Sequence, residues 1–275
     1  MKEPAIVAPR SPAAPRRRGG GRGQRFALQA GFFVAVIAFW SLVRVADVMS
    51  TDALPAPWTV LHRLVSDLGT SEYWTTVLDT LRSAVLGLLV AIVVGIPIGL
   101  VTGTYRAAEQ STRLVVEFGR AFPVIAILPV MLLIMGSTYE MKAVVVFLAC
   151  VFPLIIQAQY GAQSVSDAVN ETVRSYRITR LLRFRKVVLP AASPSVWTGI
   201  RIASTMAVLV SIGVEILTTV PGIGHVVMQS QQDKNSANAF AFIFTAGVLG
   251  FVINRLAQWA ESKALSWRPP IDAEA

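Results

Sequence analysis

The chain has 275 residues, of which 54% are hydrophobic and only 15% are charged, and its mean hydropathy is +0.58. A soluble domain of this size could not hide so much apolar surface, so the composition excludes an ordinary soluble fold and predicts one membrane domain. The net charge of +9 is concentrated in loops beside apolar segments, which favours a membrane topology signal over nucleic-acid binding.

Residues 1–25 are rich in Pro, Arg, Gly and Ala, a composition that predicts a disordered basic tail. The apolar run 27–45 that follows could be mistaken for a secretory signal. It is long enough to span a bilayer, however, and it ends without a small-x-small cleavage site. We interpret it as an uncleaved first helix with the tail inside the cell.

A moderately amphipathic segment, 59–75, separates this run from five further apolar runs, which cover approximately 77–103, 117–136, 141–159, 196–217 and 239–258. The second run of the chain carries Gly87, Gly95 and Gly99, whose spacing predicts a small-residue face for helix packing. Pro123 and Pro129 interrupt the third run. They predict a kinked helix that either widens a translocation path or simply shapes packing.

Basic residues are distributed asymmetrically over the loops between these runs. Nineteen of the 25 fall in the N-terminal tail and in segments 103–120, 160–195 and 255–275, whereas the opposite side holds only five basic residues beside seven acidic ones. The six apolar runs predict an all-α, polytopic protein with about six transmembrane helices, and the positive-inside rule places both of its termini in the cytoplasm. Residues 269–275 are expected to be a short C-terminal tail.

Two charged residues fall inside the fifth apolar run. Glu215 is its sole acidic residue and lies near the predicted external end, where we expect a role at an external gate or in helix–helix hydrogen bonding ahead of direct contact with substrate. Arg201, near the inner end, is interpreted as a topology anchor.

The chemistry of ordinary enzyme sites is missing from the sequence. Cys150 is the only cysteine, and His62 and His225 lack the spacing of metal ligands. There is no nucleophile triad, no pair of carboxylates and no GxxxxGK[ST] phosphate loop. We therefore expect no catalytic residues, no metal and no cofactor bound by this chain; ATP, if used, would be hydrolysed by a partner.

The most distinctive segment is the hairpin 164–195, which reads SVSDAVNETVRSYRITRLLRFRKVVLPAASPS. It combines helix formers with six positive charges and ends at Pro190 and Pro194, which we expect to stop the helix. A topology signal, or binding of anionic lipid at about 1 kcal/mol per charge, would need charge but no particular residue order. Here Glu171 is expected to begin a helical stretch, where it would favour the positive end of the helix dipole.

The order of residues in the hairpin resembles the coupling loop of permease subunits of binding-protein-dependent ABC importers. That loop reads E-A-A, three residues, G, nine residues, I-x-L-P. The spacing is the same here, and Glu171, Leu189 and Pro190 match in identity. The departures are Thr172 and Val173 for the alanines, Arg177 for the glycine and Val187 for the isoleucine.

Other segments resemble the branch of permeases that serves sulfonate, taurine and nitrate importers. These segments are LPAPWTVL (54–61), 80–103, RAFPVIAILPVMLLIMG (120–136), VEILTTVPGIGHVV (214–227) and the C-terminal run 239–268. The resemblance covers residues 27–268 and implies a type I ABC importer permease fold over 26–268, in the plasma (inner) membrane of a bacterium.

The resemblance also implies a function and partners. Two such subunits would form the path for a small solute, with a small anion such as a sulfonate, taurine or nitrate as the expected cargo. The expected partners are cytoplasmic ABC ATPase subunits, a second copy or a paralogous permease, an extracytoplasmic solute-binding protein and membrane lipid, but no nucleic acid. The residues implied in docking to the ATPase are Asn170, Glu171, Thr172, Val173, Arg174, Ser175, Tyr176, Arg177, Ile178, Leu189 and Pro190; Pro123, Pro129 and Glu215 are the candidates for the path or its gate.

Arg177 is the informative departure from the family pattern. Glycine would allow a tight turn there, whereas arginine disfavours the turn and adds charge. We interpret the arginine as the mark of a heterodimer whose other permease keeps a standard loop; the alternative is a homodimer with an adapted ATPase. Two other functions stay open, namely an ion-gradient-driven secondary transporter and a non-transporting membrane scaffold. The first would need intramembrane charges in paired halves, and the chain offers Glu215 and no clear internal repeat.

Overall fold

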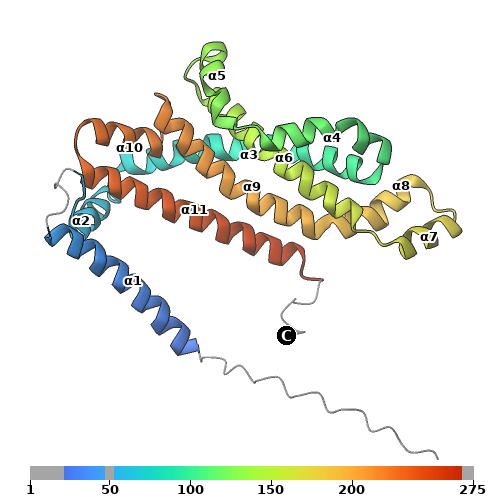
Figure 1. The fold of residues 1–275 in the computed structure, drawn as a ribbon, viewed down its shortest axis with the longest axis horizontal. Coiled ribbons are helices and arrows are strands. Elements are labelled where there is room, and N and C mark those ends of the chain that lie inside the picture. Colours follow the sequence, from blue (N-terminus) through green and yellow to red (C-terminus); the bar gives the residue numbers. More distant parts are fainter. Residues whose placement is uncertain (1–21, 47–52, 268–275) are drawn as a thin grey trace, which may run out of the picture. The chain divides into compact units, whose positions relative to one another are not determined.

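The computed structural model describes residues 22–46 and 53–267, and all regular structure in these ranges is helical (Figure 1). The chain divides into two units, residues 1–50 and 51–275. Within the described part of the first unit lies one helix, α1 (Arg22–Val45), which is long and apolar enough to cross a membrane. It begins four residues inside the predicted tail 1–25. The rest of that tail, and the predicted tail 269–275, lie outside the described residues.

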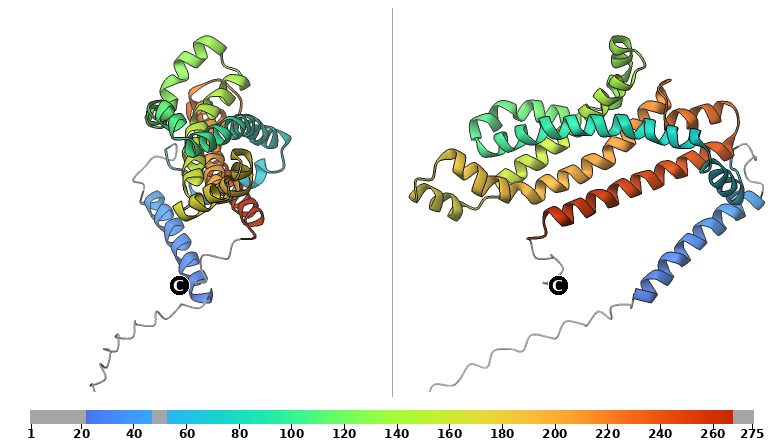
Figure 2. Two further views of the ribbon diagram at one scale, coloured as in Figure 1. Left: turned by 90° about the vertical axis from the view of Figure 1, so that its right-hand side faces the viewer. Right: turned by 180° about the vertical axis from the view of Figure 1, so that it is seen from behind.

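The second unit is built around three long helices, α3 (Ser71–Thr104), α6 (Tyr139–Gln163) and α9 (Leu189–Leu217), with α11 (Ser236–Ala264) beside α9 (Figures 1 and 2). Each has the length and composition of a membrane span. With α1 and one broken pair of helices, the described residues hold five or six candidate spans, so the prediction of about six is confirmed. α3, α6 and α11 extend beyond their predicted bounds because polar caps lie outside the apolar runs, whereas α9 begins earlier than predicted, at Leu189, without a side-chain cap.

Side-chain caps explain where three of these helices begin. The hydroxyl of Thr70 accepts a hydrogen bond from the backbone N–H of Tyr73, and that of Thr138 accepts one from Met141. Asn235 caps α11 in the same way. Such caps satisfy N–H groups that have no partner within the helix.

The contact between α3 and α6 depends on glycine. Gly87, Gly95, Gly99 and Gly103 face α6, and a Cβ atom at any of them would press on an α6 backbone carbonyl and on a side chain next to it. The predicted small-residue face is confirmed, with Gly103 as a further member. Small residues let the two backbones approach closely, which is how helices pack in a membrane where apolar burial alone gives no preference for protein over lipid.

The main core lies where α3, α6 and α9 meet. Its buried residues are small or branched and include Ala84, Ala91, Val146, Cys150, Leu154, Ala203 and Ala207. Pro97, Pro153 and Pro194 lie inside these helices without ending them. Such prolines are tolerated where neighbouring helices satisfy the freed backbone groups.

The predicted third span is broken rather than kinked. Helix α4 (Arg106–Ala121) ends before Pro123, a short 3-10 turn η1 (Val124–Ile127) follows, and α5 (Leu128–Met135) leaves at 87° to α4 (Figure 1). Pro123 therefore lies between two helices, and Pro129 lies in the first turn of α5, where its missing N–H leaves no bond unmade.

Two shorter helices complete the end of the unit far from residues 164–195. α2 (Pro57–Asp67) packs on α11, where Arg63 bonds to Asp67 and Asn238. α10 (Ile223–Gln232) lies against α9 and α11 (Figure 1). The hydroxyls of Tyr73 and Thr245, 3.0 Å apart, join α3 to α11.

Candidate functional site

The hairpin projects from the end of the bundle where α6 ends and α9 begins (Figure 1). It consists of α7 (Asp167–Ser175), a four-residue helix α8 (Arg180–Arg183) and a π-helical turn η2 (Phe184–Val188). Because α6 leads into the hairpin and α9 leads out of it, any partner held there acts on two core helices at once.

Glu171 lies in the middle of α7 and not at its start. The acidic residue of the first turn is Asp167, so the expected stabilisation of Glu171 by the helix dipole is wrong. Glu171 is exposed, as are Thr172, Arg174, Ser175 and Tyr176. An exposed carboxylate that does not cap its own helix is available to a partner.

Arg177 adopts the turn that arginine was expected to disfavour. Its φ is +50°, in the left-handed region. The N–H of Arg177 bonds to the carbonyl of Arg174, and the N–H of Ile178 bonds to that of Val173, at 3.0 and 3.1 Å. These two bonds make a Schellman ending of α7, in which the left-handed position is usually glycine. The hairpin therefore has the turn that the family glycine would provide, at the cost of placing a Cβ there.

The two sides of the hairpin are tied together by polar contacts. Nη2 of Arg183 donates to Oδ1 of Asn170 at 2.9 Å, and Nδ2 of Asn170 donates to the carbonyl of Val165. Val173 is the buried residue of α7. Asn170 and Val173, both implied in docking, thus hold the hairpin's own shape, while their exposed neighbours face outward.

Pro190 does not end the helix, contrary to our expectation. α8, η2 and α9 continue without a break from Arg180 to Leu217. The N–H of Leu189 bonds five residues back, to Phe184, so a wider turn precedes the proline. That turn relieves the clash that a proline ring otherwise makes with the carbonyl four residues earlier. Leu189 and Pro190 are exposed at this junction.

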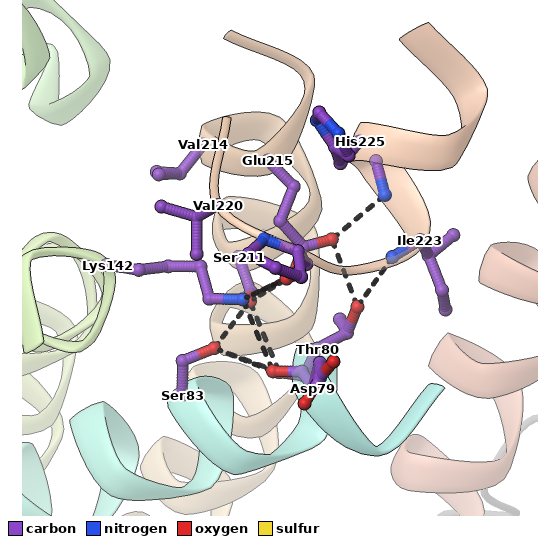
Figure 3. A network of polar contacts seen from close by, with 12 residues as sticks. Asp79, Thr80, Ser83, Lys142, Ser211, Val214, Glu215, Val220, Ile223 and His225 are labelled. Carbon is purple, nitrogen blue, oxygen red and sulfur yellow. Dashed lines mark hydrogen bonds and ion pairs between the residues drawn. The ribbon is translucent and has the colours of Figure 1, made fainter. Parts of the chain in front are cut away.

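A second polar site lies at the opposite end of the bundle (Figure 3). Nζ of Lys142 on α6 lies 2.7 Å from Oε1 of Glu215 on α9, and both side chains are fully buried. The same ammonium group donates to the carbonyls of Asp79 and Pro221, each at 3.2 Å. Its three donors are thus all used, as a buried cation requires.

The carboxylate of Glu215 is equally well satisfied. Oε2 accepts from Oγ1 of Thr80 at 3.0 Å and from the backbone N–H of Gly224 at 2.9 Å. Oε1 also accepts from Ser211, whose hydroxyl lies 3.2 Å from that of Ser83. Glu215 therefore hydrogen-bonds between helices, which was one of the two roles considered for it.

Glu215 also explains two glycines in the segment that follows α9. The N-terminus of α10 is capped from outside, since Thr80 accepts from the N–H of Ile223 and Glu215 accepts from that of Gly224. A Cβ on Gly222 would collide with the Glu215 carboxylate, and one on Gly224 would collide with the α9 backbone. Gly222 also has φ +152°. The segment can fold back over Glu215 only because both residues are glycine.

Lys142 was missed by sequence reasoning, which singled out only Glu215 and Arg201 as charged residues within an apolar run. The signal was present, because Lys142 and Glu215 both lie within apolar runs near the same predicted membrane face. Arg201 also has a partner: it bonds to Glu261 of α11 at 3.1 Å, nearer the hairpin end, so it is more than a topology anchor.

The structure brings the path candidates only partly together. Val220 and Leu128 belong to one apolar cluster with Met141 and Val214, so the segment after Glu215 touches the broken helix close to Pro129. A polar groove of about 310 Å³ lies separately between α4 and α6, where its lining includes Glu109, Arg113, Glu117, Arg120, Gln159 and Gln163. Within the described residues no group of three or more His, Cys, Asp or Glu side chains could hold a metal.

Comparisons with known proteins agree on one family. A family model described as "Binding-protein-dependent transport system inner membrane component" matches residues 95–265. The chain is 26% identical over 268 residues to a Bacillus subtilis protein named as an aliphatic sulfonates transport permease, SsuC, covering 97% of each chain. It is 28% identical over 193 residues to the nitrate import permease NrtB of Leptolyngbya laminosa, covering 70% of this chain and 69% of that one.

A solved structure shows the same fold. The inward-facing MetNI methionine ABC transporter contains a chain that superimposes with a TM-score of 0.62 at 17% identity. The match covers 78% of this chain and 99% of that one.

Proposed function

The chain belongs to the inner membrane components of binding-protein-dependent transport systems, and from this premise we propose that it carries a small anion inward and receives its driving energy through the hairpin 164–195. The predicted type I importer permease fold is confirmed. The chain is a non-catalytic permease subunit of an ABC importer, and ATP is hydrolysed by a separate ATPase.

The observation that carries the coupling proposal is the form of the hairpin. α7 projects from the bundle with Glu171, Tyr176 and Arg177 exposed, and Tyr176 is 78% exposed despite its large ring. An exposed aromatic ring among charged side chains is typical of a protein interface. The Arg183–Asn170 bond and the continuous helix from Arg180 to Leu217 support a rigid hairpin, which can transmit a movement of the ATPase to α9 without deforming.

The proposed cargo rests on the relatives. Their names give aliphatic sulfonates, nitrate and, for the CmpB permease of Synechococcus elongatus, bicarbonate. These solutes share a small size and a negative charge. A small anion is therefore the substrate class that best fits this chain.

A second permease is supported by the broken helix. α4 has no buried residue, and Leu114, Val115 and Phe118 are largely exposed on it. On α5, Leu133 and Ile134 are exposed as well. The heterodimer interpretation rested on arginine disfavouring the turn at 177 and adding charge there; since the turn is present, we favour a second copy of this chain as the partner.

We further propose that the hairpin faces the cytoplasm of a bacterium and that the Lys142–Glu215 end faces outward, where a solute-binding protein would dock. The clustering of basic residues in and around the hairpin supports this orientation.

The decisive experiment is reconstitution of the permease in vesicles with its ATPase and its binding protein. Labelled taurine, nitrate and bicarbonate serve as probes. We expect ATP-dependent uptake of at least one of them, and only when all components are present. Uptake driven by a proton or sodium gradient without ATP would instead support a secondary transporter, and recruitment of a partner without any uptake would support a scaffold.

The role of the hairpin is tested by Glu171→Ala, which should abolish co-purification of the ATPase while leaving the amount of permease in the membrane unchanged. Glu72→Ala is the matched control, because Glu72 is an exposed glutamate at the other end of the bundle. Equal loss of the ATPase in both variants would contradict docking at the hairpin. Native mass spectrometry of the complex then decides between two copies of this chain and a pair of different permeases.

A further inference from the structure

The two helices that flank the hairpin are joined again at their far ends. Lys142 on α6 and Glu215 on α9 each lie at least 20 residues from the hairpin, or roughly 30 Å along their helices at 1.5 Å per residue. Their 2.7 Å ion pair thus cross-links the two arms of one long helical loop at the end opposite to the hairpin.

The pair also holds the segment 218–222, which we call the end loop. Lys142 donates to the carbonyl of Pro221 within it, and Glu215 accepts from the N–H of Gly224, two residues after it. Val220 is buried between α6, α9 and α5, and Thr219 bonds to Ser137. A displacement of either arm at this level must therefore displace the end loop.

Stability alone does not account for a buried ion pair. Replacing such a pair with apolar residues of similar volume is often neutral or stabilising, because two charges lose their hydration. What the pair adds is a set of hydrogen bonds with fixed directions. The three donors of Lys142 point to α3, α9 and the end loop, so they add directed bonds that hold α6 along and around its axis, beyond the non-directional gain from apolar burial.

We infer that Lys142 and Glu215 are positioning residues that make α6, the hairpin, α9 and the end loop move as one body, so that closure of the ATPase subunits on the hairpin changes the exposure of the end loop. This inference rests on the proposed function, because the ATPase provides the movement. The pair holds its own elements and does not touch the cargo.

The test uses the complex of the full chain with its ATPase in lipid nanodiscs. Thr219→Cys in a Cys150→Ala background places one exposed thiol on the end loop. Its labelling rate by a membrane-impermeant maleimide is measured without nucleotide and with ATP plus vanadate, which traps the closed ATPase. We expect the two rates to differ in this otherwise unchanged permease.

The informative variant is Lys142→Met with Glu215→Gln. It removes both charges, while the glutamine oxygen can still accept from Gly224 and Thr80. We expect ATP hydrolysis to persist and the nucleotide-dependent difference in labelling to be lost. Glu215→Ala alone is unsuitable, because it leaves the ammonium group buried and unpaired and would impair folding.

Arg201→Gln with Glu261→Gln is the matched control. This ion pair joins α9 to α11 instead of joining the two arms, so the labelling difference should remain. The inference is overturned if the Lys142→Met/Glu215→Gln variant keeps the nucleotide-dependent difference in labelling, or if the Arg201→Gln/Glu261→Gln control loses it as well. It is also overturned if the permease with an intact ion pair shows no such difference, or if the Lys142→Met/Glu215→Gln variant does not assemble with the ATPase. If no ATPase binds even to the unmodified chain, the result contradicts the proposed function itself. If the ATPase binds and hydrolyses ATP, the labelling experiment tests only the positioning role of Lys142 and Glu215.

Discussion

At the scale of single residues, Arg177 shows how a departure from a family pattern can preserve the backbone. Its φ of +50° and the two hydrogen bonds that close α7 reproduce the turn in which glycine is usual. A left-handed conformation costs an L-residue with a Cβ roughly 1–2 kcal/mol. The hairpin tolerates that cost because both bonds of the turn are made.

Arg177→Gly should therefore stabilise the hairpin. Relief of the left-handed strain exceeds the entropy that glycine adds to the unfolded chain, about 0.4–1 kcal/mol, and leaves a net gain of about 0.5–1 kcal/mol. Hydrogen exchange should show slower opening of the amides of residues 167–178. Arg174→Gly, which removes the same charge inside α7, should speed up their exchange. Faster exchange in Arg177→Gly would contradict the assigned turn.

At the scale of elements, the contact of α3 with α6 is set by backbone approach. A side chain at Gly99 would run into the carbonyl of Ile155 and the methyl of Ala158. In a packed interface an added side chain forces strained rotamers or a backbone shift, which costs about 1–3 kcal/mol or more. The spacing of the glycines predicted this face, but the helix that lies on it became known only from the structure.

Gly99→Leu should consequently reduce the folded permease in the membrane, and its thermal unfolding by fluorescence-detected size exclusion should move to lower temperature. Gly250→Leu is the control, because a Cβ at Gly250 of α11 meets no atom within 4 Å in the described residues. If the two variants behaved alike, close approach of α3 and α6 would not be what these glycines provide.

At the scale of the whole molecule, charge separates the two ends of the second unit. The hairpin and its surroundings carry the basic clusters, while the opposite end holds a buried ion pair whose charges cancel. Orientation in a bilayer follows the basic residues of short loops, so the hairpin should face the cytoplasm.

Single thiols test this orientation directly. In the Cys150→Ala background, Thr219→Cys should react with an impermeant maleimide in spheroplasts, because it lies on the end loop. Ser175→Cys, at the end of α7, should react only after the membrane is opened. Both positions are exposed, so burial does not explain a difference between them. The opposite pattern would reverse the proposed direction of transport.

The sequence by itself determined the class of this protein, the number of its spans, its family and the place of the hairpin. These properties follow from the length of the apolar runs, the charge of the loops and the local order of residues, all of which are local features of the sequence. Only the tertiary structure decided that Lys142 pairs with Glu215, that Pro190 lies within a continuous helix and that the third span breaks by 87°. Each of these three features depends on neighbours distant in sequence or on how the backbone relieves a local clash, and the hydropathy pattern contains no information about either.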